Sequence, residues 1–424
     1  MDSKLLTDNY FNEAEKLFHK HWVFLIEPWP IITNDKYHRT ETKEVKSMAH
    51  VRSFVQDRLG IVPVFFFLTK VFPIKDYPGP YRNIEKGLLI IYHLLTGRSI
   101  DDMEQFIPKS SYYDIHKNFY ITQHDTMDKC ISKLLCTMFS SIKLRLFSAM
   151  KNNPKQMKQV TMHLDGHDTR ASYVSHATSS EMYSFKLKKS GFRTQVITDA
   201  NNMILYVSKS QPCKDYNDGT MFLDMKIDRK IDPLDCVACD GGYPLFIAKY
   251  LETSEVLNDS NFCYPIRKAR NVELTSQEKE YNKYFGSFRS RIEGTFGELG
   301  TTFERFNNKA PIRVTDINTF TLQLKLACLL LNIKTFCKTF AINPEPHNSL
   351  WLKELYEYPG NNRSQEFTVT PTQNLNQKVM LSQNMLNLQK EFLGLIVDDA
   401  DESMCPDNSN QVLKFSHIEI PSLQ

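Results

Sequence analysis

Three acidic residues lie at positions where predicted strands and a helix could hold their carboxylates in place. The apolar runs 160–164 and 236–239 predict strands, and each is followed by an aspartate and a glycine, Asp165-Gly166 and Asp240-Gly241. Glu293 lies in a segment with apolar residues at steps of three and four, which predicts an amphipathic helix. Three carboxylates that converge from two strand ends and a helix can hold two divalent cations, and such a pair drives in-line displacement at a phosphodiester.

The alternative for each of these acids is an ordinary surface role. An Asp-Gly pair taken alone is common turn chemistry. An Arg289–Glu293 pair on a solvated helix face would contribute only about 0.3 to 0.5 kcal/mol. However, an aspartate directly after a buried strand lies at the rim of a sheet, and the glycines after Asp165 and Asp240 would allow a sharp turn beside a large polyanion. The three segments in this order favour a metal site.

Basic residues follow the first aspartate and flank the glutamate, where they are expected to contact a phosphate backbone. They are Lys186, Lys188, Lys189, Arg193, Arg267, Lys268, Arg289 and Arg291. A solvated hairpin tip would have a similar composition, and the two arginines beside Glu293 could simply balance its charge. The net charge of +3 means that any DNA-binding surface must be local.

The composition is that of a globular protein with room for two or three domains in 424 residues. Nine scattered cysteines, an odd number, favour reduced thiols in a cytosolic or nuclear protein. Cys236 and Cys239 form a CxxC pair, but no second pair stands at zinc-ligand spacing, so strand residues are favoured over a metal site. We expect no secretory signal and no membrane span.

Residues 81–150 are predicted to be helical, after a region 1–80 to which no role is assigned. Gly97 should end a first helix, Ser99 should cap a second one that Pro108 breaks, and Ser110 should cap a third. A longer helix should contain Ile131 and Leu135. Short capped helices joined by tight turns are compatible with a helix-turn-helix, and the alternative is a small bundle that only packs against the next domain.

Residues 155–340 are predicted to form an α/β domain with a mixed sheet. Runs 195–198 and 203–207 indicate a hairpin around the turn 199–202, and 236–239 indicates a buried strand. Helices are expected over 276–306 and 316–340. Residues 341–424 read as a linker and an acidic tail, in which 395–397 is either a partner-binding strand or a chance apolar triplet.

An ordered series of motifs runs through residues 85–340. In this order they resemble the Harbinger-like group of the DDE superfamily of endonucleases, eukaryotic relatives of bacterial insertion-sequence transposases. The motifs are Leu95-Thr96-Gly97-Arg98-Ser99, Leu164-Asp165-Gly166, Tyr183-Ser184-Phe185-Lys186, Asn217-Asp218, Asp240-Gly241-Gly242-Tyr243-Pro244, Tyr264-Pro265 and Arg289-Ser290-Arg291-Ile292-Glu293.

The resemblance implies an RNase H-like fold, in which a mixed sheet is flanked by helices and preceded by an all-α helix-turn-helix-like domain. It implies catalytic and metal-binding roles for Asp165, Asp240 and Glu293, with two Mg²⁺ or Mn²⁺ ions as cofactors. The implied activity is cleavage at transposon ends and transfer of the freed 3′-hydroxyl into target DNA in the nucleus. The implied partners are DNA, a Myb-like accessory DNA-binding protein and further copies of the chain.

One departure and two rival functions stay open. The first motif reads Asp-Gly-His-Asp, where a threonine or serine commonly follows the glycine, so Asp168 is either an accessory ligand or unrelated to the metal. A domesticated descendant that binds DNA or protein without cleaving is one rival. A plain RNase H-like hydrolase without strand transfer is the other.

Overall fold

The computed structural model describes residues 3–22, 25, 32–33, 48–72, 81–173, 180–268, 272–313, 316–354 and 356–358. Residues 1–364 form one compact unit, and everything below concerns that unit. The triplet 395–397 and the acidic stretch 398–402 lie outside the described residues.

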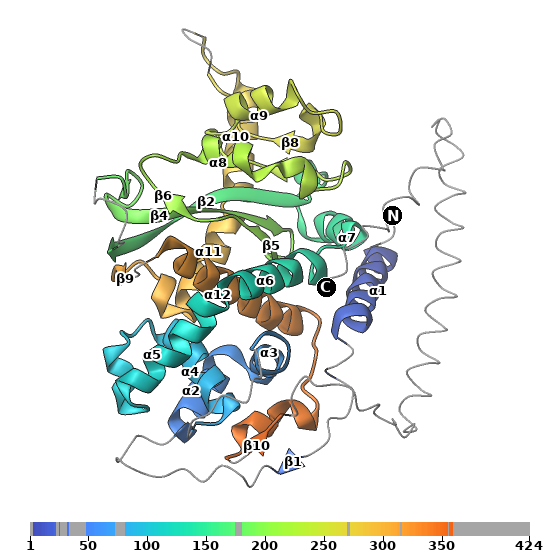
Figure 1. The fold of residues 1–424 in the computed structure, drawn as a ribbon. Coiled ribbons are helices and arrows are strands. Elements are labelled where there is room, and N and C mark those ends of the chain that lie inside the picture. Colours follow the sequence, from blue (N-terminus) through green and yellow to red (C-terminus); the bar gives the residue numbers. More distant parts are fainter. Residues whose placement is uncertain are drawn as a thin grey trace. The chain divides into compact units, whose positions relative to one another are not determined.

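Strands of the central region form one eight-stranded sheet within the described residues (Figure 1). Its main path is β3-β4-β2-β7-β8, while β5 and β6 pair with β4 and β9 pairs with β2. The strands are β2 (Met162–Tyr173), β3 (Tyr183–Ser184), β4 (Lys189–Asp199), β5 (Ile204–Val207), β6 (Gln211–Pro212), β7 (Val237–Ala238), β8 (Phe262–Cys263) and β9 (Ile312–Arg313).

The sheet is mixed because it joins an antiparallel meander to a parallel pair. β4 runs antiparallel to both β2 and β5, and β7 runs parallel to both β2 and β8. The predicted hairpin is confirmed, with Asp199 accepting hydrogen bonds from the backbone of Asn201 (2.8 Å) and Met203 (2.9 Å) in its turn. The prediction of an α/β fold with a mixed sheet flanked by helices agrees with this arrangement.

Helices cover both faces of the sheet. In Figure 1, α8 (Asp218–Met225) and α9 (Pro244–Leu251) lie on one side, and α6 (His124–Met138) and α12 (Ile317–Thr339) lie on the other. Asp316 caps α12 by accepting hydrogen bonds from the backbone of Asn318 and Thr319, so the predicted helix over 316–340 is confirmed. α12 is long and apolar enough to cross a membrane, but 83% of its most apolar window is buried inside the protein.

The remaining helices pack around these layers. They are α1 (Ser3–Trp22), α2 (Met48–Leu59), α3 (Ile61–Phe66), η2 (Phe67–Val71), α4 (Asn83–Thr96), η3 (Asp101–Gln105), α5 (Lys109–Lys117), η4 (Asn118–Thr122), α7 (Ile142–Asn152), η5 (Lys155–Met157), η6 (Ile227–Arg229), η7 (Asp259–Asn261), α10 (Ser276–Arg289), α11 (Arg291–Thr302), η8 (Glu304–Phe306) and η9 (Pro346–Leu352).

Three helix boundaries were predicted for the region that precedes the sheet. Two of them agree with the structure and one is wrong. α4 ends at Gly97, whose φ of 62° is left-handed and suits glycine. Ser99 does accept a hydrogen bond from the backbone of Asp102, although it precedes only the short 3₁₀ turn η3. Ser110 is not a cap, because α5 already begins at Lys109 with Pro108 before it. A helix-turn-helix role for this region stays a prediction.

The helix predicted over 276–306 is divided. Ser290 ends α10 and begins α11, and η8 follows after Phe303. The apolar steps of three and four continue across the break because both helices turn apolar residues such as Phe288 and Ile292 into the core. The periodicity therefore hid the junction.

The region predicted as a linker from residue 341 is ordered at its start. η9 buries Trp351 completely, and the carbonyl of Trp351 accepts a hydrogen bond from Nε of Arg52 at 3.2 Å. β10 (Tyr356–Glu357) then pairs antiparallel with β1 (Ile32–Thr33). The linker prediction is therefore wrong for 346–358, where an apolar anchor and a strand pair hold the chain on the N-terminal helices.

Candidate functional site

The three predicted carboxylates meet at one guanidinium, that of Arg289. Its Nη1 lies 3.2 Å from Oδ2 of Asp165, its Nη2 lies 3.4 Å from Oε1 of Glu293, and its Nε lies 3.9 Å from Oδ1 of Asp240. The fold thus brings together acids from a central strand, the end of a second strand and the start of a helix. The cation at their centre is supplied by the chain itself.

Asp165 lies within a strand rather than at its end, which corrects the sequence interpretation. β2 continues from Met162 to Tyr173, and Asp165 faces Val196 of β4 in an unbroken antiparallel register. Its side chain is only 7% exposed. The carboxylate is therefore held by a rigid central strand.

Gly166 has a different use from the turn that the sequence predicted. A Cβ at this position would lie 2.0 Å from Oδ1 of Asp218, so the missing side chain leaves the space that the Asp218 carboxylate fills. Asp218 belongs to the first turn of α8, which Asn217 caps. The Asn217-Asp218 motif was visible in the sequence, but nothing local assigned it to the same place as Asp165.

Asp240 and Glu293 are the solvent-facing members. Asp240 lies two residues after the end of β7, close to the predicted strand end, and its side chain is 53% exposed. Glu293 lies in the first turn of α11 and is 59% exposed. Because Asp165 is buried and the other two are open, the group has an inner wall and an accessible side.

Burial and neighbouring cations act in opposite directions on the pKa values of Asp165 and Asp218. Burial raises the pKa of Asp165, while Lys186 and Arg289 pull it down and Asp240 pushes it up. Burial also raises the pKa of Asp218, with Arg193 opposing the shift and Asp165 adding to it. Both carboxylates therefore gain from any additional cation that approaches them.

The carboxylate oxygens are the donor type that Mg²⁺ and Mn²⁺ prefer. As the structure stands, no three His, Cys, Asp or Glu side chains in the described part of the chain are grouped closely enough to hold one ion. The carboxylates of the triad converge on the guanidinium of Arg289. The donor set therefore fits a divalent cation, and the cation would compete with Arg289 for it.

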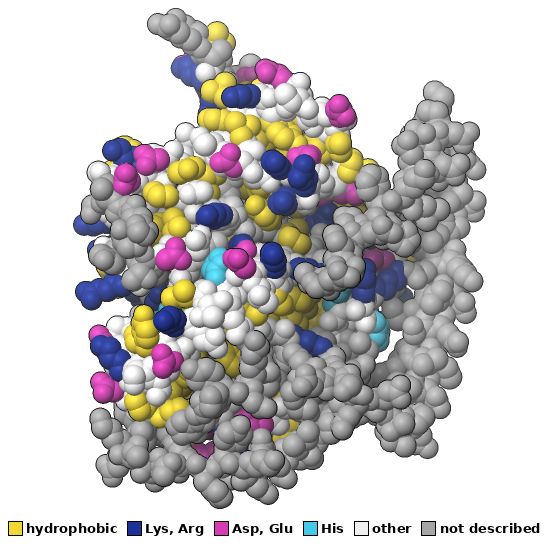
Figure 2. Space-filling view, viewed as in Figure 1, with side chains coloured by type: hydrophobic (Ala, Val, Ile, Leu, Met, Phe, Trp, Pro, Cys, Tyr) yellow, Lys and Arg dark blue, Asp and Glu magenta, His cyan; other side chains and the backbone are white. Residues whose placement is uncertain are grey.

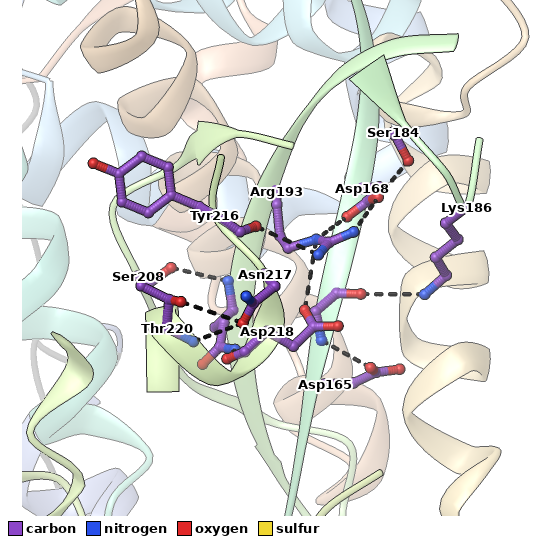
Figure 3. A network of polar contacts seen from close by, with 12 residues as sticks. Asp165, Asp168, Ser184, Lys186, Arg193, Ser208, Tyr216, Asn217, Asp218 and Thr220 are labelled. Carbon is purple, nitrogen blue, oxygen red and sulfur yellow. Dashed lines mark hydrogen bonds and ion pairs between the residues drawn. The ribbon is translucent and has the colours of Figure 1, made fainter. Parts of the chain in front are cut away.

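Asp168 belongs to a separate internal network (Figure 3). It accepts hydrogen bonds from Nε (2.7 Å) and Nη2 (2.9 Å) of Arg193 and from the hydroxyl of Ser184 (2.5 Å). Burial alone would raise the pKa of Asp168, but these hydrogen bonds outweigh burial and lower it. Nε of Arg193 also lies 3.5 Å from Oδ1 of Asp218. Asp168 is thus explained without a metal.

Some of the residues predicted to contact DNA are exposed to solvent, and others have side chains that bind groups within the protein. Lys186, Lys188, Lys189, Arg267 and Lys268 are exposed. Nζ of Lys186 donates a hydrogen bond to the carbonyl of Gly166 at 3.2 Å, so it is next to the carboxylates. Lys268 pairs with Glu273, and Arg267 donates to the carbonyl of Gly241.

The side chains of Arg193 and Arg291 both bind other groups of the protein. Arg193 pairs with Asp168. Arg291 donates to Oδ1 of Asn153 (3.1 Å) and to the carbonyl of Asn152 (2.9 Å), which ties α11 to the end of α7. On the face shown in Figure 2, basic and acidic side chains are interspersed. DNA contact by the basic residues stays a prediction, and these two arginines have structural partners that explain them.

The CxxC residues are packed into the core on either side of their strand. Cys236 packs with Cys263 and Phe285, whereas Cys239 packs in the main hydrophobic core. Burial raises the pKa of the Cys236 thiol to about 12 and that of Cys239 well above its usual value. Zinc binds thiolates, so these neutral thiols agree with the structural interpretation.

Residues 164–332 match the family model described as DDE superfamily endonuclease. No curated protein and no solved structure gave a significant match to the chain. The matched segment begins one residue before Asp165 and includes Asp218, Asp240, Arg289 and Glu293. The match thus covers all the carboxylates gathered at this site, and it suggests a nuclease activity of the transposase type.

Proposed function

We propose that the protein is a metal-dependent DNA endonuclease of the DDE type, with Asp165, Asp240 and Glu293 as its metal-binding residues. The observation that carries the proposal is the convergence of these three acids on Arg289 inside the segment that matches the endonuclease family. Three acids drawn from elements far apart in the chain are costly to hold together unless a cation is shared. Because Asp240 and Glu293 are exposed, an ion that they share with the buried Asp165 would be open to a substrate.

Within this proposal the acids hold two Mg²⁺ or Mn²⁺ ions, which when bound supply nucleophile activation and stabilisation of the leaving oxygen. Asp165 anchors the inner side of the group from a rigid strand. Asp218, packed over Gly166, adds negative charge beside Asp165 and thereby strengthens cation binding. The exposed Lys186, Lys188 and Lys189 offer a path for the DNA backbone to the carboxylates.

We further propose the finer assignments that the resemblance implies. These are an RNase H-like catalytic domain, membership of the Harbinger-like group, and cleavage at transposon ends followed by joining of the 3′-hydroxyl to target DNA. They include a nuclear location, assembly of several copies on DNA and a Myb-like accessory protein. The helical region 81–150 is proposed to contact DNA only weakly, which would give such an accessory protein its purpose.

The test is cleavage of a labelled duplex that carries the terminal repeats of the candidate element, in Mg²⁺ or Mn²⁺. We expect nicking by the wild type, loss of nicking by at least 100-fold in Asp240→Asn, and full activity in Asp224→Asn. Asp224 is an exposed acid on α8, so it controls for the loss of one surface charge. A folded wild type that binds the duplex and never cuts it would overturn the nuclease and favour the domesticated binder. Nicking without 3′-end joining would favour the plain hydrolase.

A further inference from the structure

A second polar cluster surrounds a cavity of about 430 Å³ between the N-terminal helices and the end of the sheet. α4 and α5 contribute one wall, and the segment 304–313 with α12 contributes the other. Three arginines lie along it, namely Arg98, Arg305 and Arg313. This cavity takes no part in the function proposed above.

Arg305 is a buried cation without an acidic partner in the described part of the chain. The residue is only 9% exposed. Its Nε donates to Oε1 of Gln323 at 2.8 Å, and its Nη1 lies 3.3 Å from Nε2 of His93. Both partners are uncharged groups. Buried charges are normally paired with an opposite charge, because transfer from water is costly.

The histidines beside Arg305 do not supply or remove charge at neutral pH. Burial, followed by the nearby Arg305, lowers the pKa of His116 to about 4 and that of His93 well below its usual value. Both rings are therefore neutral. The positive potential of the cavity comes from the buried guanidinium and the two arginines at its rim.

Acids also border the cavity, but each has a cation of its own. Glu304 lies 3.1 Å from Nη2 of Arg58, and Asp101 pairs with Lys109. The charge left at the centre of the cavity is that of Arg305, and the exposed Arg98 and Arg313 add to it. The cavity thus selects for a negatively charged ligand.

The size and the remaining walls indicate what the anion is attached to. Tyr113 and Ile121 are half exposed and line the cavity together with Pro311. A volume of this size is within the range of small-molecule sites and exceeds the needs of a bare oxyanion. We propose that the cavity binds a phosphate ester of the nucleotide class, with the phosphate at Arg305 and the ring against Tyr113.

This site is separate from the carboxylates. Ile312 lines the cavity and pairs with Ala171 of β2. Ala171 stands six residues after Asp165 on the same strand, which at about 3.3 Å per residue is roughly 20 Å. The proposal is therefore independent of the nuclease proposal, and either can fail alone.

The experiment is calorimetric titration and thermal unfolding of the full chain with three probes. These are inorganic phosphate, deoxyadenosine monophosphate, and a short DNA duplex with or without a 5′-phosphate. We expect the mononucleotide to bind and to raise the melting temperature. Arg305→Met should abolish this binding, and Arg98→Gln and Arg313→Gln, which alter exposed residues, should each weaken it roughly 5- to 10-fold. Asp240→Asn should leave it unchanged.

Each outcome decides the proposal. Mononucleotide binding that depends on Arg305 and the rim arginines supports a free nucleotide as the ligand. Binding only of the 5′-phosphorylated duplex, with the same dependence, supports the same phosphate chemistry with a DNA end as its source. The proposal is overturned if none of the probes binds. It is also overturned if binding is insensitive to Arg98→Gln and Arg313→Gln but is lost in Asp240→Asn. The rim variants keep the test decisive even if Arg305→Met does not fold.

Discussion

Replacement of Arg289 by methionine should tighten the binding of Mn²⁺. In the structure the guanidinium neutralises Asp165, Asp240 and Glu293 at 3.2, 3.9 and 3.4 Å. A cation that takes these carboxylates must first break these contacts in the wild type and has none to break in Arg289→Met. Methionine keeps most of the length and apolar volume of the side chain while it removes the charge.

The magnitude follows from the burial of the three pairs. A charged hydrogen bond such as that to Asp165, whose side chain is 7% exposed, is worth about 1.5 to 3 kcal/mol. The two pairs to exposed acids contribute about 0.2 to 1 kcal/mol each. Part of this interaction free energy is regained in the wild type when the displaced guanidinium is hydrated. We therefore expect Mn²⁺ binding to be about 2 to 3 kcal/mol more favourable in Arg289→Met. At about 1.4 kcal/mol per factor of ten, Mn²⁺ should bind roughly 30- to 150-fold more tightly.

The assay is titration of Mn²⁺ into the metal-free full chain, followed by calorimetry or by the electron paramagnetic resonance signal of free Mn²⁺. It should be performed at pH 8, because loss of Arg289 raises the pKa of Asp165 further and protons then compete at lower pH. Arg291→Met is the matched control, since Arg291 contacts Asn152 and Asn153 instead of the acids. Unchanged or weaker Mn²⁺ binding in Arg289→Met, or an equal gain in Arg291→Met, would refute the reasoning.

Three further predictions concern the scaffold. Gly166→Ala should displace the Asp218 carboxylate, lower the free energy of unfolding by about 1 to 3 kcal/mol and weaken cleavage. The control is Gly242→Ala, where a Cβ meets nothing within 4 Å. It should behave as the wild type in denaturation and cleavage assays. Asp235→Ala should cost about 3 to 5 kcal/mol in urea unfolding, because it leaves Arg145 buried without the carboxylate that it contacts at 2.6 and 3.0 Å, and a loss below 1 kcal/mol would contradict this. Burial raises the pKa of Asp199 from 3.8 to about 6, so its contribution to stability is fully present below pH 3.8 and is lost as the pH rises through 6. Asp199→Asn should flatten the stability profile between pH 4 and 7, and an unchanged slope would exclude Asp199 as its origin.

Local pattern predicted those parts of the fold that depend on neighbours in sequence. The hairpin around Asp199, the strand before Asp240 and the helix that begins near Asp316 all follow from turn residues and apolar runs within a few residues. The break at Ser290 was not predicted, because the two successive helices both face the core and together preserve one apolar spacing. The short apolar run Leu350-Trp351-Leu352 was also overlooked, although Trp351 supplies the buried anchor of this segment.

The candidate site was only partly accessible to the same reasoning. Asp165, Asp240 and Glu293 were identified from order and from the family resemblance, and the structure brings them to one point. The role of Arg289 between them was interpreted as phosphate contact or as charge balance with Glu293, since its other two partners, Asp165 and Asp240, are remote in sequence. Likewise Gly166 was assigned to a turn, because only the tertiary fold reveals that Asp218 fills the space beside it.

The distance along the chain between the members of the carboxylate group has a consequence for how the protein is made. Arg289 and Asp165 are separated by 124 residues, and α11, which carries Glu293, is synthesised after every strand of the sheet except β9. Contacts of such high sequence separation form late, after the entropy of closing long loops has been overcome. A nascent or prematurely ended chain that stops before Arg289 therefore contains the residues of every strand of the sheet except β9 and still lacks part of the metal-binding group. Under the proposed function, the capacity to cut DNA would arise only once synthesis has passed Glu293.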